Sequence, residues 1–521
     1  MNKFKQRLTA FLAGRNFASG LLVAIVIAAV VFVNIIAYTL TSFFGLYFYS
    51  PEEDDLSISE ASDKLFADAR AAGKKVSITF CMDKKELSGH TTGSFVHTTA
   101  QEFKARYPEF IEINYVNVYT KLYSDSEGYA NGDVFDASLY QKSVDAKTGR
   151  EHEYKLLGTS VIFEYKAEDE NGLIKRNFRV VTDSYTSAGF ADFYTLDSSL
   201  NMTSYNGEEM FASMIAWVLS DSHGTAYMTT GHGEVADLSL ASALVCAGYY
   251  VDQIDLKKQN VPDDAELVVI SNPKNDFERS SNPTLATEIS RLTDYKERGG
   301  KFFVAIDPYA KKLPVLESFV ADFGISISRT ESGSNYMVKD SDNAITTDGF
   351  TLVADYSDGS YASAMSARTE QYGGSVIIRD AAALSLTGSA EPILMSSKSA
   401  VCQANGETVD GEGGYTIAAV SSVTNEASET SQMFFIPSVY LTATDAMITD
   451  GYSNKNFLYS LFGEFYGQGL MPYGCSGIVF NDGMLENLTM GTARIYTALM
   501  LAVPVVIAAV GTVVLIRRKN R

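Results

Sequence analysis

Two long uncharged segments, one near each end of the chain, restrict its possible folds more than any other feature. Residues 16–51 contain no Asp, Glu, Lys or Arg, and Leu, Val, Ile and Ala dominate from Gly20 to Leu40. A second uncharged run extends from Ile495 to Ile516. Because about 20 apolar residues cross a bilayer as a helix, we expect one transmembrane helix in residues 1–50 and another in residues 495–521.

The alternative for the first segment is a cleaved signal peptide. Such a peptide has an apolar core of about 7–15 residues followed by small residues. Here bulky aromatic residues follow instead, namely Phe43, Phe44, Tyr47 and Phe48. The pattern therefore favours a retained helix.

Basic residues flank both segments on their outer sides. Lys3, Lys5, Arg7 and Arg15 precede the first segment, and Arg517, Arg518, Lys519 and Arg521 follow the second. Positive flanks stay in the cytoplasm. We therefore expect a two-pass protein of the plasma membrane, with both termini cytoplasmic, a large extracytoplasmic domain, and the lipid bilayer as a partner.

The part of the chain between the basic tails is strongly acidic. Each tail carries four positive charges, so a formal net charge of −21 for the whole chain leaves −29 on residues 16–516. A surface of this sign repels nucleic acid. We expect no nucleic-acid partner.

Residues 51–205 alternate between helical and strand patterns. Ser57 and Glu60 have the spacing of a capping box, and the strand Val76–Phe80 ends at Cys81. Further helical and strand patterns follow, which indicates a layered α/β domain of the thioredoxin-like kind. Since Met82 and two charged residues follow Cys81, thiol redox chemistry is excluded.

Residues 206–470 form a second and more regular α/β pattern. The strand Thr225–Thr230 is followed by a helix and by further strands in alternation, which predicts a doubly wound parallel sheet. Residues 324–431 are richer in Gly, Ser, Thr and Asp, and we interpret them as β-rich insertions before Met433–Ile436 returns to the same sheet. Residues 471–494 are then a juxtamembrane linker.

Several catalytic and binding motifs are missing from the sequence. There is no G-x-x-x-x-G-K-[ST] loop, no H-E-x-x-H and no G-x-S-x-G. Cys81, Cys246, Cys402 and Cys475 are far apart and form no cluster with the spacing of metal ligands. The sequence does not decide whether two of them form a disulfide. We expect a protein that is not an enzyme and has no cofactor.

The most distinctive local motif is Gly231-His232-Gly233-Glu234, at the carboxyl end of a predicted strand. Open α/β sheets place ligands at this edge, and Asp307 ends another strand there. These five residues are the candidate ligand-binding site. The alternative, which we favour, is a tight strand-to-helix turn whose polar side chains bond locally.

His90 and His97 are a weaker candidate for a metal site. Their spacing of seven can place both on one helix face, but no third ligand joins them. We expect no metal there.

A series of ordered landmarks runs through the second pattern. They are Gly207-Glu208-Glu209, AYMTTGHGE (226–234), VPDDA (261–265), YKERGG (295–300) and FFVAIDP, which ends at Pro308. In this order they resemble the landmarks of the GldG-type auxiliary subunits of ABC-2 family transporters. The resemblance implies a thioredoxin-like domain followed by a glutamine-amidotransferase-like domain. It also implies an ABC-2 permease and a separate P-loop ATPase as partners, without catalysis.

The leading hypothesis is therefore a non-catalytic, membrane-anchored accessory subunit of an ABC-2 type transport system. One alternative is an extracytoplasmic enzyme that uses a crevice near His232, Glu234 and Asp307 for acid and base chemistry. Another is a surface adhesin or sensor that works without an ATPase.

Overall fold

The structure of the chain is a computed structural model. It describes residues 56–480, apart from residues 146–147, 169–170, 183–188, 198, 221–222, 236, 281, 283–284, 373, 449–450, 470 and 476.

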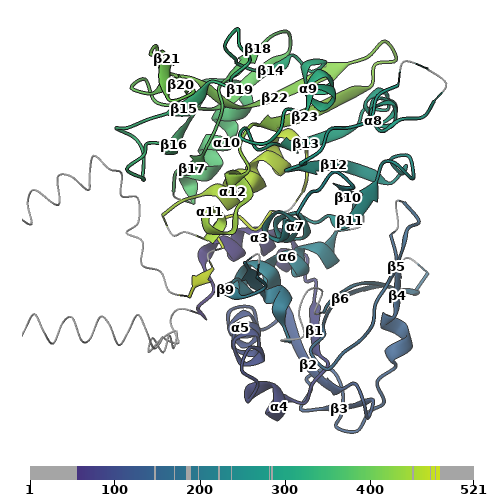
Figure 1. Cartoon of the computed structure of the whole chain (residues 1–521). Coiled ribbons are helices and arrows are strands. Elements are labelled where there is room, and N and C mark those ends of the chain that lie inside the picture. Colours follow the sequence, from purple (N-terminus) through teal and green to yellow (C-terminus); the bar gives the residue numbers. More distant parts are fainter. Residues whose placement is uncertain are drawn as a thin grey trace, which may run out of the picture. The chain divides into compact units, whose positions relative to one another are not determined.

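A five-stranded sheet is built from the first half of this range (Figure 1). Its strands are β3 (Leu122–Ser124), β2 (Ile111–Asn117), β1 (Val76–Phe80), β6 (Val161–Glu168) and β7 (Ile174–Val181), in that spatial order. β1 and β2 are parallel, whereas β6 is antiparallel to β1 and β7 is antiparallel to β6. The sheet is therefore mixed, and β7 is an edge strand.

Helices precede and connect these strands. They are α3 (Glu60–Ala71), α4 (Lys84–Ser88) and α5 (Gly93–Arg106), with the 3-10 turns η2 (Ala137–Tyr140) and η3 (Ala191–Phe193) later in the chain. The N-cap of α3 is Ser59 rather than the predicted Ser57. Ser59 has extended backbone, and its Oγ accepts a hydrogen bond from the backbone N of Ala61 at 3.3 Å. Glu208 holds Ser59 in place by accepting from its backbone N at 2.9 Å.

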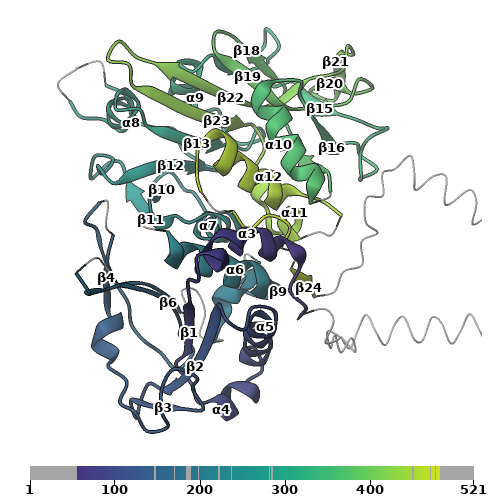
Figure 2. The same ribbon diagram turned by 180° about the vertical axis from the view of Figure 1, so that it is seen from behind.

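The helix α6 (Gly207–Leu219) lies between the two main sheets in both views (Figures 1 and 2). It is buried along almost its whole length, as expected of a helix that is apolar on all sides. Phe211 packs against Phe103 of α5 and Phe163 of β6, with ring centroids 5.6 and 5.3 Å apart. The predicted boundary between residues 205 and 206 thus falls at the start of a helix that both sheets share.

The second sheet has nine strands. In spatial order they are β11 (Tyr250–Asp255), β10 (Thr225–Thr230), β12 (Ala265–Ser271), β13 (Lys301–Ala305), β23 (Thr430–Ile436), β22 (Thr416–Thr424), β19 (Ala390–Met395), β16 (Thr351–Tyr356) and β17 (Val376–Arg379). The strands from β11 to β23 are parallel, and those from β23 to β17 are antiparallel. The predicted parallel sheet is therefore extended into a mixed one. The return of residues 433–436 to this sheet is confirmed, because β23 pairs with β13.

Side chains of the central strands alternate between two buried faces, as parallel sheets require. Val269 and Phe303 point into the larger core, which also contains α7 (Leu238–Cys246), α10 (Ser360–Gln371) and α12 (Asn454–Ser460). Val268 and Phe302 point to the opposite face, where α8 (Glu288–Glu297) and α9 (Pro314–Ala321) cover them. Helices on both faces leave the strand ends as the accessible edge.

Smaller elements complete the fold. Two strand pairs are β4 (Lys142–Val144) with β5 (Glu151–Glu153) and β14 (Ile325–Ile327) with β18 (Leu384–Leu386). Two three-stranded sheets consist of β15 (Met337–Lys339), β20 (Val401–Ala404) and β21 (Glu407–Asp410), and of β8 (Tyr194–Leu196), β9 (Met202–Tyr205) and β24 (Ile478–Val479). The short helices are η4 (Tyr440–Thr442), α11 (Thr444–Ile448) and the π-helix η5 (Leu461–Phe465). β24 lies in the predicted linker of residues 471–494, so part of that segment is structured.

The predicted fold class and localisation need a correction at the two ends of the chain. Across the described ranges, no helix is long and apolar enough to cross a membrane. The longest helix there is α5 with 14 residues, whereas a span needs about 20. Both predicted spans, in residues 1–50 and 495–521, lie outside the described residues. Over the residues that it describes, the structure has an α/β fold with mixed sheets and no membrane-spanning helix, and the predicted two-pass topology is withdrawn.

Candidate functional site

The turn that follows β10 takes its shape from two glycines. Gly231 and Gly233 have φ angles of 104° and 78°, a left-handed backbone that residues with a Cβ rarely adopt. The turn carries the intervening residue, His232, back into the protein, where its side chain is fully buried. This turn is the motif that the sequence analysis selected.

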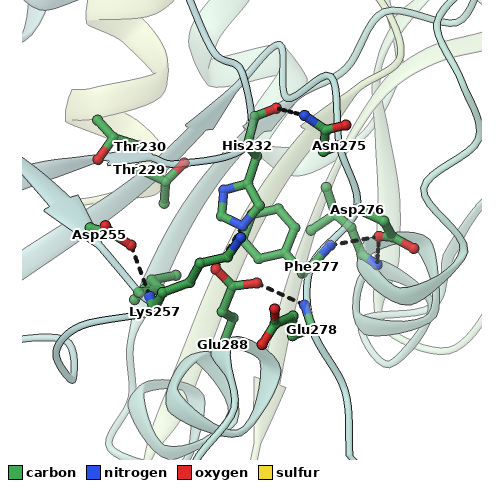
Figure 3. A network of polar contacts seen from close by, with 12 residues as sticks. Thr229, Thr230, His232, Asp255, Lys257, Asn275, Asp276, Phe277, Glu278 and Glu288 are labelled. Atoms are coloured by element: carbon green, nitrogen blue, oxygen red, sulfur yellow. Dashed lines mark hydrogen bonds and ion pairs between the residues drawn. The ribbon is translucent and has the colours of Figure 1, made fainter.

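The His232 ring is held from both sides by carboxylates. Figure 3 shows the ring together with one of them, Glu288. Its Nδ1 lies 3.0 Å from Oε1 of Glu234, and its Nε2 lies 2.8 Å from Oε1 of Glu288 at the start of α8. Glu234 also accepts a hydrogen bond from the His232 backbone N at 2.7 Å and another from Thr229 Oγ1 at 3.1 Å. The ring stacks on Phe277 with centroids 3.8 Å apart.

Charge stabilises this network. Burial by itself lowers the pKa of His232, but the hydrogen bond that the ring donates to Glu234 and the negative charge of Glu288 outweigh it and raise that pKa above its ordinary value. Burial likewise acts to raise the pKa of Glu234, and its bonds with His232 lower it overall. Both ring nitrogens are occupied, so His232 has no free nitrogen to accept a proton from a substrate.

The same turn organises the loop after β12. The carbonyl oxygen of His232 accepts hydrogen bonds from the backbone N atoms of Lys274 and Asn275, both at 2.8 Å. Oε2 of Glu288 accepts from the backbone N of Glu278 at 2.7 Å. His232 therefore joins the turn after β10, the loop after β12 and the first turn of α8.

Asp307 lies at the same edge of the sheet but belongs to a different set of contacts. Its Oδ1 accepts from the backbone N of Tyr309 at 3.0 Å, and its Oδ2 forms an ion pair with Lys274 Nζ at 3.2 Å. Its side chain is 27% exposed, whereas that of His232 is 0% exposed. The five predicted residues are thus neighbours through Lys274, yet His232 and Asp307 do not face a common open crevice.

Glu288 is the functional neighbour that the sequence analysis missed. It lies 56 residues from His232 in the chain, and the sequence analysis selected no residue of that segment. Its exposed fraction is 1%, which is unusual for a carboxylate at a helix start. In the sequence, the only local sign of this partner of His232 is an acidic residue at the start of a helix.

A cavity of about 180 Å³ lies beside this network, at the carboxyl ends of β10, β12 and β23, and both apolar and polar side chains line it. Asp237, the N-cap of α7, accepts from Thr442 Oγ1 at 2.6 Å and from the backbone N of Leu240 at 3.0 Å. Burial raises the pKa of Asp237. Open sheets bind ligands at such a point, between neighbouring strands whose connections run in opposite directions.

The two histidines of the weaker candidate have separate roles. His97 Nε2 lies 2.7 Å from Tyr115 Oη, and its Nδ1 lies 3.3 Å from Ser88 Oγ. His90 Nδ1 accepts from the backbone N of Gly93 at 3.1 Å. Within the ranges that the structure covers, no three His, Cys, Asp or Glu side chains are placed to hold a metal ion.

All four cysteines are buried as free thiols. Cys81 directly follows β1, and burial raises its pKa to about 12. The thiol is therefore protonated and unreactive at neutral pH.

Comparisons with known proteins give limited information. The sequence matches no family model and no curated protein. Among solved structures, the N-terminal domain of mmIFT52 is 14% identical and covers 47% of this chain and 98% of its own, with a TM-score of 0.34. The structure of PurLQS from Thermotoga maritima is 12% identical and covers 46% of this chain and 98% of its own, with a TM-score of 0.26. Likeness at this level assigns neither a fold nor an activity.

Proposed function

We propose that this chain is a non-catalytic accessory subunit of a transport system of the ABC-2 type. Its partners in this proposal are a permease and a separate P-loop ATPase, and its α/β domain binds a partner or substrate. The observation that carries the non-catalytic part is the closed His232 network. At the turn where an amidotransferase-like domain would need a nucleophile, a fully buried imidazole is held between Glu234 and Glu288.

The absence of a nucleotide-binding loop in the sequence supports the need for a separate ATPase. Gly299-Gly300-Lys301 is the nearest approach to such a loop, but Lys301 begins the buried strand β13 instead of a helix. A phosphate-binding loop needs a helix N-terminus directly after it. Energy for transport would therefore come from a partner chain.

The test is to purify the tagged full-length chain from its native cells and to identify proteins that copurify in stoichiometric amounts. A permease together with a P-loop ATPase supports the proposal, and their reproducible absence refutes it. The tag alone, expressed in the same cells, is the control.

A variant separates the accessory role from an enzymatic one. Asp307→Asn removes the accessible carboxylate at the sheet edge while Tyr309 N keeps an oxygen acceptor. The proposal expects normal partner binding and normal transport. Loss of function in a variant of unchanged stability and unchanged partner binding would favour the enzymatic alternative.

A further inference from the structure

A second and larger cavity, of about 300 Å³, lies where the edge strand β7 meets α6 and α7. Much of its lining is apolar and comes from β7, β8, α6 and α7. This part of the wall includes Val181, Leu196, Met210, Met214, Leu238 and Ala243. The cavity is of the size at which small-molecule sites begin, and such sites combine apolar walls with a few polar groups.

Arg179 on β7 is the distinctive polar group of this cavity. Its guanidinium lies over two aromatic rings, 5.3 Å from the centroid of Trp217 and 4.7 Å from that of Tyr250. Among the residues that the structure describes, no ion pair joins this guanidinium to Glu153 or Asp192, two acidic residues of the lining. The rings position the guanidinium without neutralising its charge.

The other cation in the lining is already neutralised. Lys455 Nζ forms an ion pair with Oε2 of Glu209 at 2.8 Å, and Tyr459 Oη donates to Oε1 of Glu209 at 2.6 Å. The side chain of Glu209 is 3% exposed and that of Lys455 is 17% exposed, so a largely buried carboxylate neutralises the charge of Lys455. Arg179 is therefore the cation of the lining that is left to receive an anion from outside.

The surroundings of Arg179 also have unused hydrogen-bonding capacity. Trp217 Nε1, His152 Nε2 and His223 Nε2 are buried and have no partner in the described part of the chain. His152 stacks on Tyr250 and His223 stacks on Trp217, the two rings that hold Arg179. Burial, together with the charge of Arg179, lowers the pKa of each histidine to about 4. Both rings are neutral at pH 7 and do not compete with Arg179 for an anion.

We propose that this cavity binds a small amphiphile, whose carboxylate or phosphate head pairs with Arg179 and whose apolar chain lies against α6 and α7. A guanidinium binds either anion through two parallel hydrogen bonds. The apolar chain gains by leaving water, at about 25 cal/mol per Å² of buried surface. The site is separate from the His232 network and goes beyond the proposed accessory role.

The chain provides its own reporter for the test. Trp217 is the only tryptophan, and its ring contacts the guanidinium of Arg179. The full-length chain is titrated with octanoate, octyl phosphate and octanol while the fluorescence of Trp217 is followed. We expect a saturable change with the anions and at least tenfold weaker binding of octanol. A tighter response to octyl phosphate identifies a phosphate head, and a tighter response to octanoate identifies a carboxylate.

Variants then test the role of Arg179 directly. Arg179→Gln should weaken binding of the better anion at least tenfold and leave octanol unchanged. Ala243→Leu should weaken all three ligands, because it fills the wall of the cavity. Arg298→Gln is the matched control, since Arg298 also lies over a ring, that of Tyr295, but outside the cavity.

Two results would overturn the proposal: equal binding of octanol and both anions to the unmodified chain, or no saturable change with either anion. Unchanged anion affinity in a folded Arg179→Gln variant would overturn it as well. If that variant does not fold, the comparison of octanol with the anions on the unmodified chain still decides the question.

Discussion

The neutral, buried His223 makes a specific prediction about stability in mild acid. Its exposed fraction is 7%, its ring stacks on Trp217 with centroids 3.6 Å apart, and its pKa is lowered to about 4. The ordinary pKa of histidine, which applies to the unfolded chain, is about 6.5. Between these two pH values, His223 binds a proton in the unfolded chain but not in the folded chain.

The sign and size of the effect follow from proton linkage. Stability rises with pH wherever the unfolded state binds more protons, so the folded state loses stability as the pH falls from 6.5 to 4. Each pH unit in this window changes the free energy of unfolding by about 1.4 kcal/mol, which gives about 3 kcal/mol for the whole window. Above pH 6.5 both states are neutral at this position and the effect vanishes.

The variant His223→Phe keeps a ring against Trp217 and removes the titration. The measurement is urea denaturation of the unmodified chain and the variant at pH 7.5 and at pH 4.5. We expect similar stability at pH 7.5 and a variant that is more stable by about 3 kcal/mol at the lower pH. Arg179→Gln is a second variant: it keeps His223, removes one cause of its lowered pKa, and should show an intermediate slope. Parallel pH dependences of His223→Phe and the unmodified chain would refute the reasoning.

Three further predictions concern other buried groups. Glu288→Gln leaves His232 with one carboxylate in a fully buried site, so we expect a loss of about 3 kcal/mol in urea denaturation at pH 6. Because the pKa of His232 is raised, its contribution is present below about pH 6.5 and is lost as the pH rises through the raised value, so the loss should shrink in alkali. Arg150→Gln removes the ion pair of the β4–β5 hairpin with Asp264, and should cost about 2 kcal/mol after allowance for partial exposure, measured by the midpoint of urea unfolding. The four buried thiols should resist a thiol reagent at pH 8 in the native state and react in 6 M guanidinium, and rapid native labelling would contradict their burial.

Local sequence patterns predict the central strands well. β1 and β10 have the predicted bounds, Val76–Phe80 and Thr225–Thr230, because both are short apolar runs that end at a turn signal. The favoured interpretation of the motif after β10 also agrees with the structure, since Glu234 bonds to the backbone N of His232. Such features depend on residues within a few positions of each other.

Features that depend on distant residues are not visible in those patterns. The partner of His232 at Nε2 is Glu288, which no local spacing relates to it. The antiparallel extension of the second sheet depends on which strand pairs with β22, and alternation alone does not give a strand its neighbour. In the sequence, Arg179 is one basic residue within a predicted strand. Only its packing against Trp217 and Tyr250 in the fold distinguishes it from an exposed arginine.

The pairing of β13 with β23 has a consequence for how the chain acquires its fold. Residues 306–429 separate two strands that lie side by side in the middle of the sheet. Contacts between such distant segments form late, because closing a long loop costs entropy before the contact repays it. During synthesis, one edge of β13 therefore remains unpaired until the intervening segment and β23 have been made. A chain that stops within residues 306–429 keeps that edge open, so we expect it to aggregate or to be degraded, although β10 to β13 are all present.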